Sequence, residues 1–112
     1  IIDCEWIANR ILNLRIFSSK ENNMELSVKD VKGDVLIVSQ FTLHAKTKKG
    51  NRPSFIKSEK SEISKILYDK FILTISELYK NKISQGIFGA DMKIRLENDG
   101  PVTIIIDSKN KE

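Results

Sequence analysis

Cysteine and histidine are scarce in this chain, which limits the disulfides, metal sites and imidazole bases that it can form. The 112 residues include one cysteine, Cys4, and one histidine, His44. A single thiol cannot form an internal disulfide or a cysteine-pair zinc site, and we interpret Cys4 as a small helix residue. This cysteine usage favours a reducing, cytoplasmic location, and only His44 is available as an imidazole base.

The signatures of several common protein classes are also missing. No run of about 18 or more apolar residues is present, so we expect no membrane-spanning helix. The glycine-rich phosphate loop and the HExxH, CxxC and GxSxG motifs are all absent. The sequence therefore lacks the common nucleotide-binding, zinc and α/β-hydrolase signatures.

Positive charge is in modest surplus and is concentrated in one stretch. Lysine and arginine number 19 against 15 acids, which gives a formal net charge of +4. The segment KTKKGNRPSFIK, Lys46 to Lys57, contains no acid. Such a segment can bind phosphates by neutralising them and releasing counterions, and a solvated loop of a lysine-rich protein is the alternative interpretation.

Apolar residues at helical spacing predict two main helices. The first helix ends near Arg15, with Trp6 interpreted as a core anchor on its apolar face. A second and longer helix is predicted over Glu59–Lys80, with a polar outer face. The residues that define the apolar face of the first helix are Ile7, Ile11 and Leu14.

Short β-like stretches surround these helices. We interpret Val35–Val38 as a central strand covered on both faces, because it is a continuous aliphatic run. Asp91–Glu97 and Val102–Asp107, joined through Asn98–Pro101, predict an antiparallel hairpin. Because helices and strands are interspersed without regular alternation, we predict one α+β domain over residues 1–112 with a mixed sheet. The remaining predicted strands are Met24–Val28 and a short strand within Lys82–Gly89.

A candidate site lies where the central strand becomes polar, at SQFT, Ser39 to Thr42. The end of a strand is a common ligand site because backbone groups become free there, and simple capping of the strand is the alternative. If the strand continued, Thr42 and His44 would leave the same face as a nucleophile and base. Neighbours on one face are roughly 6.5 to 7 Å apart, so a histidine at a loop edge is the better interpretation.

Several motifs, taken together and in this order, resemble the D-aminoacyl-tRNA deacylases, and the resemblance covers essentially the whole chain. The combination of SQFTL with a downstream NDGPVT is highly specific. The matching stretches are WIANRILNLRIF at Trp6–Phe17, LIVSQFTL at Leu36–Leu43, TKKGNRPSF at Thr47–Phe55, FGADMKI at Phe88–Ile94 and NDGPVTI at Asn98–Ile104.

The resemblance implies a homodimeric enzyme with a barrel-like sheet and no cofactor or metal. It would hydrolyse the ester between tRNA and a D-amino acid, or glycine mischarged on the alanine tRNA, for chiral proofreading in translation. A cis Gly100–Pro101 bond would project into the partner's site and exclude L-side chains. The implied catalytic residues are Ser39, Gln40, Phe41 and Thr42, and Thr103 would brace the Gly-Pro turn. The substrate pocket would be lined by Phe88, Ala90 and Met92. Contacts to tRNA would come from Lys46, Lys48, Lys49 and Arg52.

One departure from the family concerns the N-terminal side. Family members have a β-region before the first helix, and this chain begins within that helix. We therefore expect an N-terminally truncated domain with exposed sheet edges and apolar surface. Two alternatives stay open at this point, a non-catalytic RNA-binding module and an inactive fragment.

Overall fold

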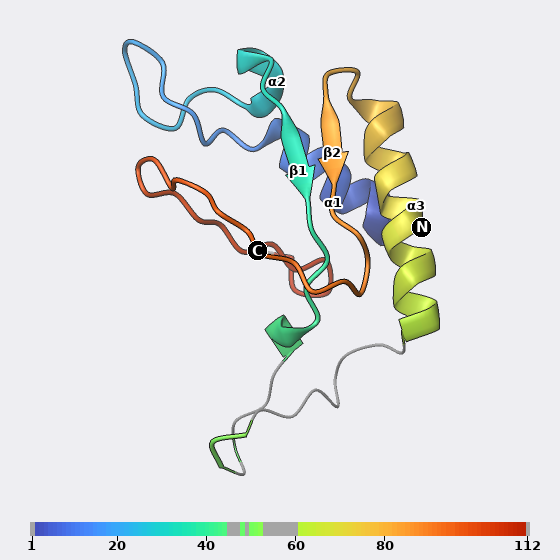
Figure 1. Ribbon diagram of the computed structural model, residues 1–112. Helices are drawn as coiled ribbons and strands as arrows, with labels where there is room; N and C mark the ends of the chain where they lie inside the picture. Colours follow the sequence, from blue (N-terminus) through green and yellow to red (C-terminus); the bar gives the residue numbers. More distant parts are fainter. Residues whose placement is uncertain (1, 45–47, 49, 53–60, 112) are drawn as a thin grey trace.

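The computed structural model describes residues 2–44, 48, 50–52 and 61–111 (Figure 1). Two helices, α1 and α3, pack beside a small parallel sheet, so the chain is an α+β protein. None of the helices in these ranges is long and apolar enough to cross a membrane. The elements in chain order are α1 (Ile2–Asn13), α2 (Val28–Val31), β1 (Val35–Ile37), the 3-10 helix η1 (Thr42–His44), α3 (Ser61–Leu78) and β2 (Ile83–Gln85).

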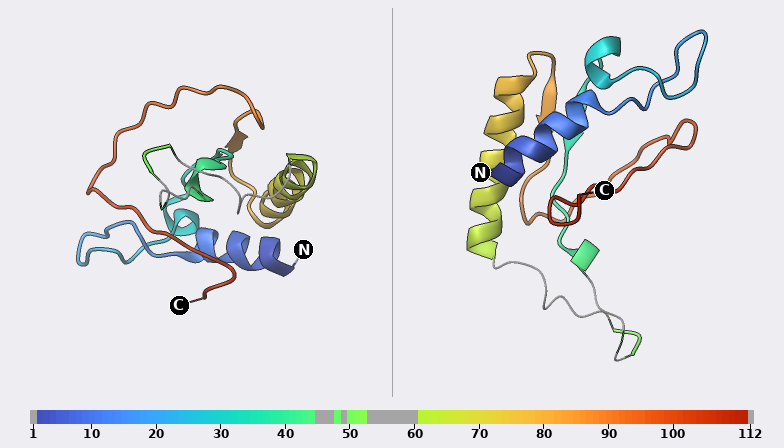
Figure 2. Two further views of the ribbon diagram at one scale, coloured as in Figure 1. Left: turned by 90° about the horizontal axis from the view of Figure 1, so that it is seen from below. Right: turned by 180° about the vertical axis from the view of Figure 1, so that it is seen from behind.

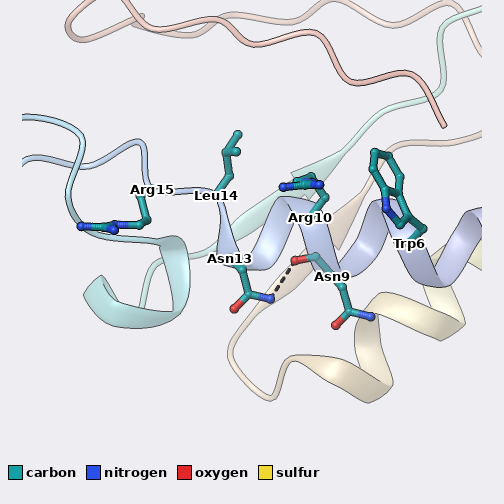
Figure 3. Close-up of a pocket in the computed structure, with 6 residues that line it drawn as sticks. All are labelled: Trp6, Asn9, Arg10, Asn13, Leu14 and Arg15. Atoms are coloured by element: carbon teal, nitrogen blue, oxygen red, sulfur yellow. Dashed lines mark hydrogen bonds between the residues drawn. The ribbon is translucent and has the colours of Figure 1, made fainter. Parts of the chain in front are cut away.

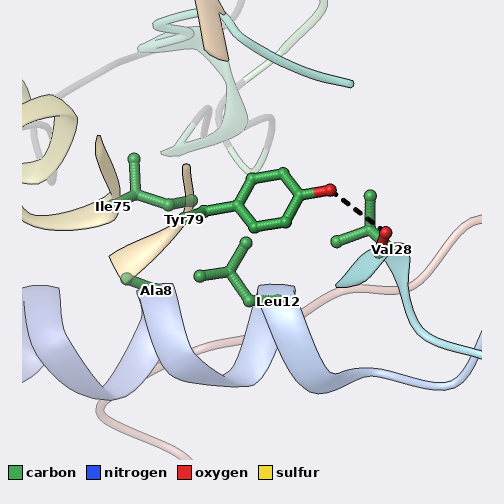
Figure 4. Packing of buried hydrophobic residues seen from close by; sticks show 5 residues of the cluster. All are labelled: Ala8, Leu12, Val28, Ile75 and Tyr79. Atoms are coloured by element: carbon green, nitrogen blue, oxygen red, sulfur yellow. Dashed lines mark hydrogen bonds between the residues drawn. The ribbon is translucent and has the colours of Figure 1, made fainter. Parts of the chain in front are cut away.

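One cluster of buried side chains joins α1, α2 and α3 (Figure 4). Ala8 and Leu12 lie one turn apart on α1 and are fully buried against Ile75 of α3. Val28 and Tyr79 complete the cluster. Both predicted helices are confirmed, with α1 ending at Asn13.

Trp6 does not anchor this core, so that prediction is wrong. The cluster contains Ala8 and Leu12, with Ile11 packed against it, whereas Trp6 lines a surface cavity. Its ring instead contacts the cations of Arg10 and Lys111. The buried stripe of α1 is therefore rotated away from Trp6.

The sheet consists of β1 and β2 paired in parallel. Val35 is opposite Ile83 and Ile37 is opposite Gln85. Val35 and Ile37 pack against the core, while Leu36 between them is 62% exposed. Figure 2 shows α1 and α3 together on one face of the strands. The prediction of a strand covered on both faces was therefore wrong, and its side chains alternate between core and solvent.

The predicted strand Met24–Val28 is replaced by a helix start. Leu26 makes only an isolated antiparallel bridge with Phe17. Ser27 is the N-cap of α2: its hydroxyl accepts from the N–H of Asp30, whose carboxylate accepts from the N–H of Ser27. This capping box satisfies two N–H donors at the start of α2. The hydrogen bonds between Ser27 and Asp30 therefore favour a helix start here, although the alternation of apolar residues had predicted a strand.

The predictions of a C-terminal hairpin and of a barrel-like sheet are also wrong. The chain bends at Asp99 and Gly100, but neither 91–97 nor 102–107 forms a strand. Seen from below in Figure 2, the two arms diverge from their turn. An isolated two-stranded hairpin is marginal in water, and Ile105 at 92% exposure has no surface to pack on. The described sheet is thus open and two-stranded.

Candidate functional site

The carboxyl ends of β1 and β2 meet under one tyrosine of α3. The Tyr68 hydroxyl lies 3.3 Å from the carbonyl oxygen of Ile37 and 3.2 Å from that of Gly86. The N–H of Gly86 also donates to the Ile37 carbonyl at 2.9 Å. Because a hydroxyl carries one proton, Tyr68 shares or alternates it between the two carbonyls. These contacts hold both strand ends together just before Ser39–Thr42.

Two of the three predicted pocket residues gather at this same end. The ring of Phe88 packs on Tyr68 with centroids 5.6 Å apart. The sulfur of Met92 lies over Gly86, only 2.7 Å from where a β-carbon would be. Glycine at position 86 therefore leaves the space that Met92 occupies. Ala90 lies in the turn between them, where its N–H donates to the Ile87 carbonyl at 3.2 Å.

The predicted catalytic stretch Ser39–Thr42 follows β1 without continuing it. Thr42 begins the 3-10 helix η1, and its hydroxyl accepts a hydrogen bond from the side-chain amide of Gln40. Phe41 is 63% exposed, so its side chain does not pack in the core.

Thr42 and His44 do not lie on one strand, so the geometry assumed for a nucleophile–base pair is absent. Residues two apart share a face in a strand, but in a 3-10 helix with three residues per turn they point in different directions. The side chain of His44 lies outside the described residues. Within the described hydrogen bonds, the partner of the Thr42 hydroxyl is an amide donor and not a base.

The Gly-Pro turn lies at the tip of an exposed excursion of the chain (Figure 1). The Gly100–Pro101 peptide bond is cis, and Gly100 has φ of +134°. The Asn98 side chain spans the turn, since its carbonyl accepts from Val102 N–H at 2.9 Å and its amide donates to Thr103 Oγ1 at 3.1 Å. No described hydrogen bond joins this turn to Ser39–Thr42 of the same chain.

The basic loop is described only in part. Lys48 and Arg52 are exposed, whereas Lys46 and Lys49 lie outside the described residues. No group of three or more histidine, cysteine, aspartate or glutamate side chains in the described ranges is arranged to hold a metal ion.

Sequence reasoning missed Tyr68 and Gly86, which shape the strand ends. Tyr68 had a weak signal, as a polar-tipped aromatic within the amphipathic helix. Gly86 had a clearer one, a glycine directly after a short strand, where close approach of another group is common. Neither signal identifies the partner, because Tyr68 contacts residues 31 and 18 positions away.

Known proteins resemble this chain over nearly its whole length. A family model described as D-Tyr-tRNA(Tyr) deacylase matches residues 2–107. The D-aminoacyl-tRNA deacylase of Flavobacterium psychrophilum is 58% identical over 110 residues, 98% of this chain and 73% of that protein. Its namesake in Bacteroides thetaiotaomicron is 53% identical over 110 residues, with the same two shares of 98% and 73%.

A solved structure shares the fold as well. The structure titled c-Myc DNA Unwinding Element Binding Protein superposes with a TM-score of 0.82 and is 38% identical in sequence. The match covers 90% of this chain and 68% of that one. With the family model, the relatives and the fold in agreement, this chain belongs to the D-Tyr-tRNA(Tyr) deacylase family.

Proposed function

We propose that this chain is a D-aminoacyl-tRNA deacylase domain, formed by residues 1–112, that hydrolyses the ester of D-aminoacyl-tRNA. The observation that carries the proposal is the family match over residues 2–107, with relatives of the same name at 52–58% identity. The products are a free D-amino acid and reusable tRNA. Such an enzyme removes mischarged D-residues before translation incorporates them, so we propose that it acts in the cytoplasm.

Ser39, Gln40, Phe41 and Thr42 form the proposed catalytic stretch. Backbone N–H groups of residues 40–42 would stabilise the negative oxygen that develops on the ester carbonyl. One such donor typically contributes about 10²–10³ in rate, equivalent to roughly 3 to 4 kcal/mol. The position of this stretch, beyond the clamped strand ends, supports the assignment because a rigid base preorganises donors.

Water is the proposed nucleophile. Thr42 as a covalent nucleophile would need a base to take its proton, and the described partner of its hydroxyl, the side-chain amide of Gln40, is a donor that cannot take one. Water would instead add to the ester carbonyl carbon, helped by the terminal ribose 2′-hydroxyl. The carbon–oxygen bond to the 3′-oxygen then breaks, and that oxygen leaves with a proton.

Phe88, Ala90 and Met92 are the proposed walls of the aminoacyl pocket. Phe88 packs on Tyr68, and Met92 lies over Gly86; both are therefore next to the joined ends of β1 and β2. Their apolar surfaces suit the adenine ring or an amino-acid side chain, because such surfaces exclude water from the ester.

Selection against L-residues is proposed to come from the Gly100–Pro101 turn of a second copy. Thr103 braces this turn through its hydrogen bond with Asn98. The turn is exposed at the tip of its excursion, which supports action in trans and a homodimer. A backbone wedge excludes side chains of one chirality without recognising them, so glycyl-tRNA, which has no side chain, would also be cleaved.

The tRNA itself is proposed to contact the basic loop. Lys48 and Arg52 are exposed, and with Lys46 and Lys49 they supply charge that neutralises phosphates. No cofactor, metal or membrane takes part in this proposal.

The test compares hydrolysis of D-tyrosyl-tRNA and L-tyrosyl-tRNA by the full chain. We expect cleavage of the D-substrate alone. Binding of both tRNAs by a folded chain without cleavage of either would favour the non-catalytic RNA-binding alternative.

The Pro101→Ala variant tests the chirality assignment. Loss of the ring makes the turn less rigid, so the ratio of D- to L-hydrolysis should fall while affinity for uncharged tRNA stays unchanged. Pro53→Ala, which removes the other proline of the chain, is the matched control and should keep the ratio. Full rejection of L-tyrosyl-tRNA by Pro101→Ala would show that the assignment is wrong.

A further inference from the structure

A groove on the outer side of α1 is not used by the proposed reaction. Trp6, Arg10 and Leu14 are spaced four residues apart, and Figure 3 shows them in a row along one side of the helix. They border two neighbouring cavities of about 650 and 390 Å³, which share these three residues and are together called the groove here. The second cavity is closed on its other side by residues 104–107 and Asn110 of the C-terminal segment.

Two cations are held on the Trp6 ring in this groove. The guanidinium carbon of Arg10 is 5.1 Å from the ring centroid, and the Lys111 ammonium is 4.8 Å from it. Neither cation forms an ion pair with another described residue. An aromatic face attracts a cation without cancelling its charge, so both remain able to bind an anion.

Acids near the groove partly offset its cations. The Asp3 carboxylate pairs with the Lys109 ammonium at 2.7 Å, and Lys109 lowers the pKa of Asp3 by hydrogen bonding to its charged form. Asp107 accepts a hydrogen bond from the neutral backbone N–H of Lys109 at 2.9 Å, so its charge stays at the edge of the groove beside the Lys109 ammonium. At the other end, Arg15 donates through Nε to the backbone carbonyl of Glu25 and also lies near the carboxylates of Glu25 and Asp30. The cations on the Trp6 ring, Arg10 and Lys111, therefore carry the argument for anion binding.

We propose that the groove bordered by Trp6, Arg10 and Lys111 binds the phosphodiester backbone of tRNA. This inference rests on the proposed function for its choice of RNA. Arg10 lines both cavities and Lys111 lies on the Trp6 ring at their edge, and cations spread in this way suit a polymer with regularly spaced phosphates. The indole offers a flat surface to a ribose or base, as aromatic residues do in single-strand binding grooves. This groove is separate from the basic loop at 46–52.

The test measures binding of uncharged tRNA to the full chain at several salt concentrations. Each phosphate contact contributes about 0.7–0.9 to the slope of log K against log salt. Arg10→Gln and Lys111→Gln should each reduce that slope by roughly one contact, and the double variant by about two. Lys70→Gln, which removes the same charge from the exposed face of α3, is the matched control and should leave the slope unchanged.

The inference would be overturned if the wild-type chain bound no tRNA, or if the salt slope for Arg10→Gln equalled that for Lys70→Gln. It would also be overturned if inorganic phosphate displaced tRNA at low millimolar concentration, because that result would identify a small-anion site. Tighter, Arg10-dependent binding of duplex DNA would also overturn it and assign the groove to DNA.

Hydrolysis of a D-tyrosyl-adenosine ester separates this inference from the proposed function. The minimal ester lacks the phosphates that the groove would contact, so Arg10→Gln should cleave it as fast as the wild-type chain does. If no variant cleaves any ester but the salt slopes change as expected, the proposed function fails and the groove assignment stands.

Discussion

At the scale of single residues, two tyrosines attach α3 to the two ends of β1. Tyr68 contacts the carbonyls of Ile37 and Gly86 at the strand ends. Tyr79 donates its hydroxyl to Gly33 O at 2.6 Å, just before β1 begins. Tyr79 directly follows α3 and its N–H still donates to Ile75 O at 2.9 Å; the two tyrosines are 11 residues apart, close to three helical turns, so they lie on the same side. Both ends of the strand are therefore fixed by one helix.

Removing each hydroxyl should separate stability from activity. Tyr68→Phe and Tyr79→Phe should each lower the free energy of unfolding by about 1 kcal/mol, the usual net contribution of a hydrogen bond. Only Tyr68→Phe should also slow hydrolysis of D-aminoacyl-tRNA, because only Tyr68 supports the strand ends before Ser39–Thr42. Urea unfolding and single-turnover hydrolysis would measure the two effects. Equal activity of the two variants would disprove a role for Tyr68 in positioning the site.

Part of the site could be predicted from residue order alone. A polar stretch after an aliphatic strand indicated the position of Ser39–Thr42, and the strand does end there. The role of Tyr68 could not be predicted, because its partners come from distant parts of the chain. Trp6 was misassigned because a large aromatic beside an apolar stripe serves equally well as a support for surface cations.

At the scale of elements, local signals predicted the helices better than the strands. Spacing identified α1 and α3, since amphipathic periodicity is a property of the helix itself. The arms at 91–97 and 102–107 have strand-like composition but pair with no strand of the described sheet. A strand depends on its neighbours, so composition alone cannot fix its pairing.

The capping box of α2 gives a prediction with a defined pH dependence. The pKa of Asp30 is lowered, chiefly by its hydrogen bond from the backbone N–H of Ser27. Because the folded-state pKa lies below the unfolded value of about 3.9, the stabilisation is present above that pH and is lost as pH falls through the lowered pKa. Asp30→Asn should therefore be less stable than wild type at pH 7, with the difference shrinking below pH ~4.

Urea unfolding at pH 7, 5 and 3 would measure this difference. Ser27→Ala should cost about 1 kcal/mol at pH 7, as the loss of an N-cap usually does. Asp99→Asn, at an exposed turn, removes the same charge without a cap and is the matched control. A difference between Asp30→Asn and wild type that stays constant down to pH 3 would contradict the assignment.

At the scale of the whole molecule, a small core supports a large apolar surface. Among the described residues, the buried cluster contains five hydrophobic side chains, whereas the exposed ones include Leu36 at 62% and Ile105 at 92%. Leu36 alternates with Val35 and Ile37, which pack against the core, so its side chain is on the other face of the sheet. Exposed apolar area of this kind marks an association surface.

Self-association should therefore depend on the uncovered face of the sheet. Sedimentation velocity over a range of concentrations should show a dimer that Leu36→Glu weakens, because the substitution places a charge on that face. Leu73→Glu makes the same change at a similar exposure, 64%, on α3 and should leave the dimer intact. A stronger effect of Leu73→Glu would place the interface on the helical side.

The parallel pairing of β1 with β2 also affects how the chain is made. Val35 pairs with Ile83, which is synthesised 48 residues later. At about 5–20 residues per second, β1 emerges from the ribosome roughly 2 to 10 seconds before β2 does. During that interval the edge of β1 has no strand to bind, and α3 is emerging. The nascent protein is thus most vulnerable to misassociation after β1 appears, and chaperone contact in that window should matter more than contact with the finished chain.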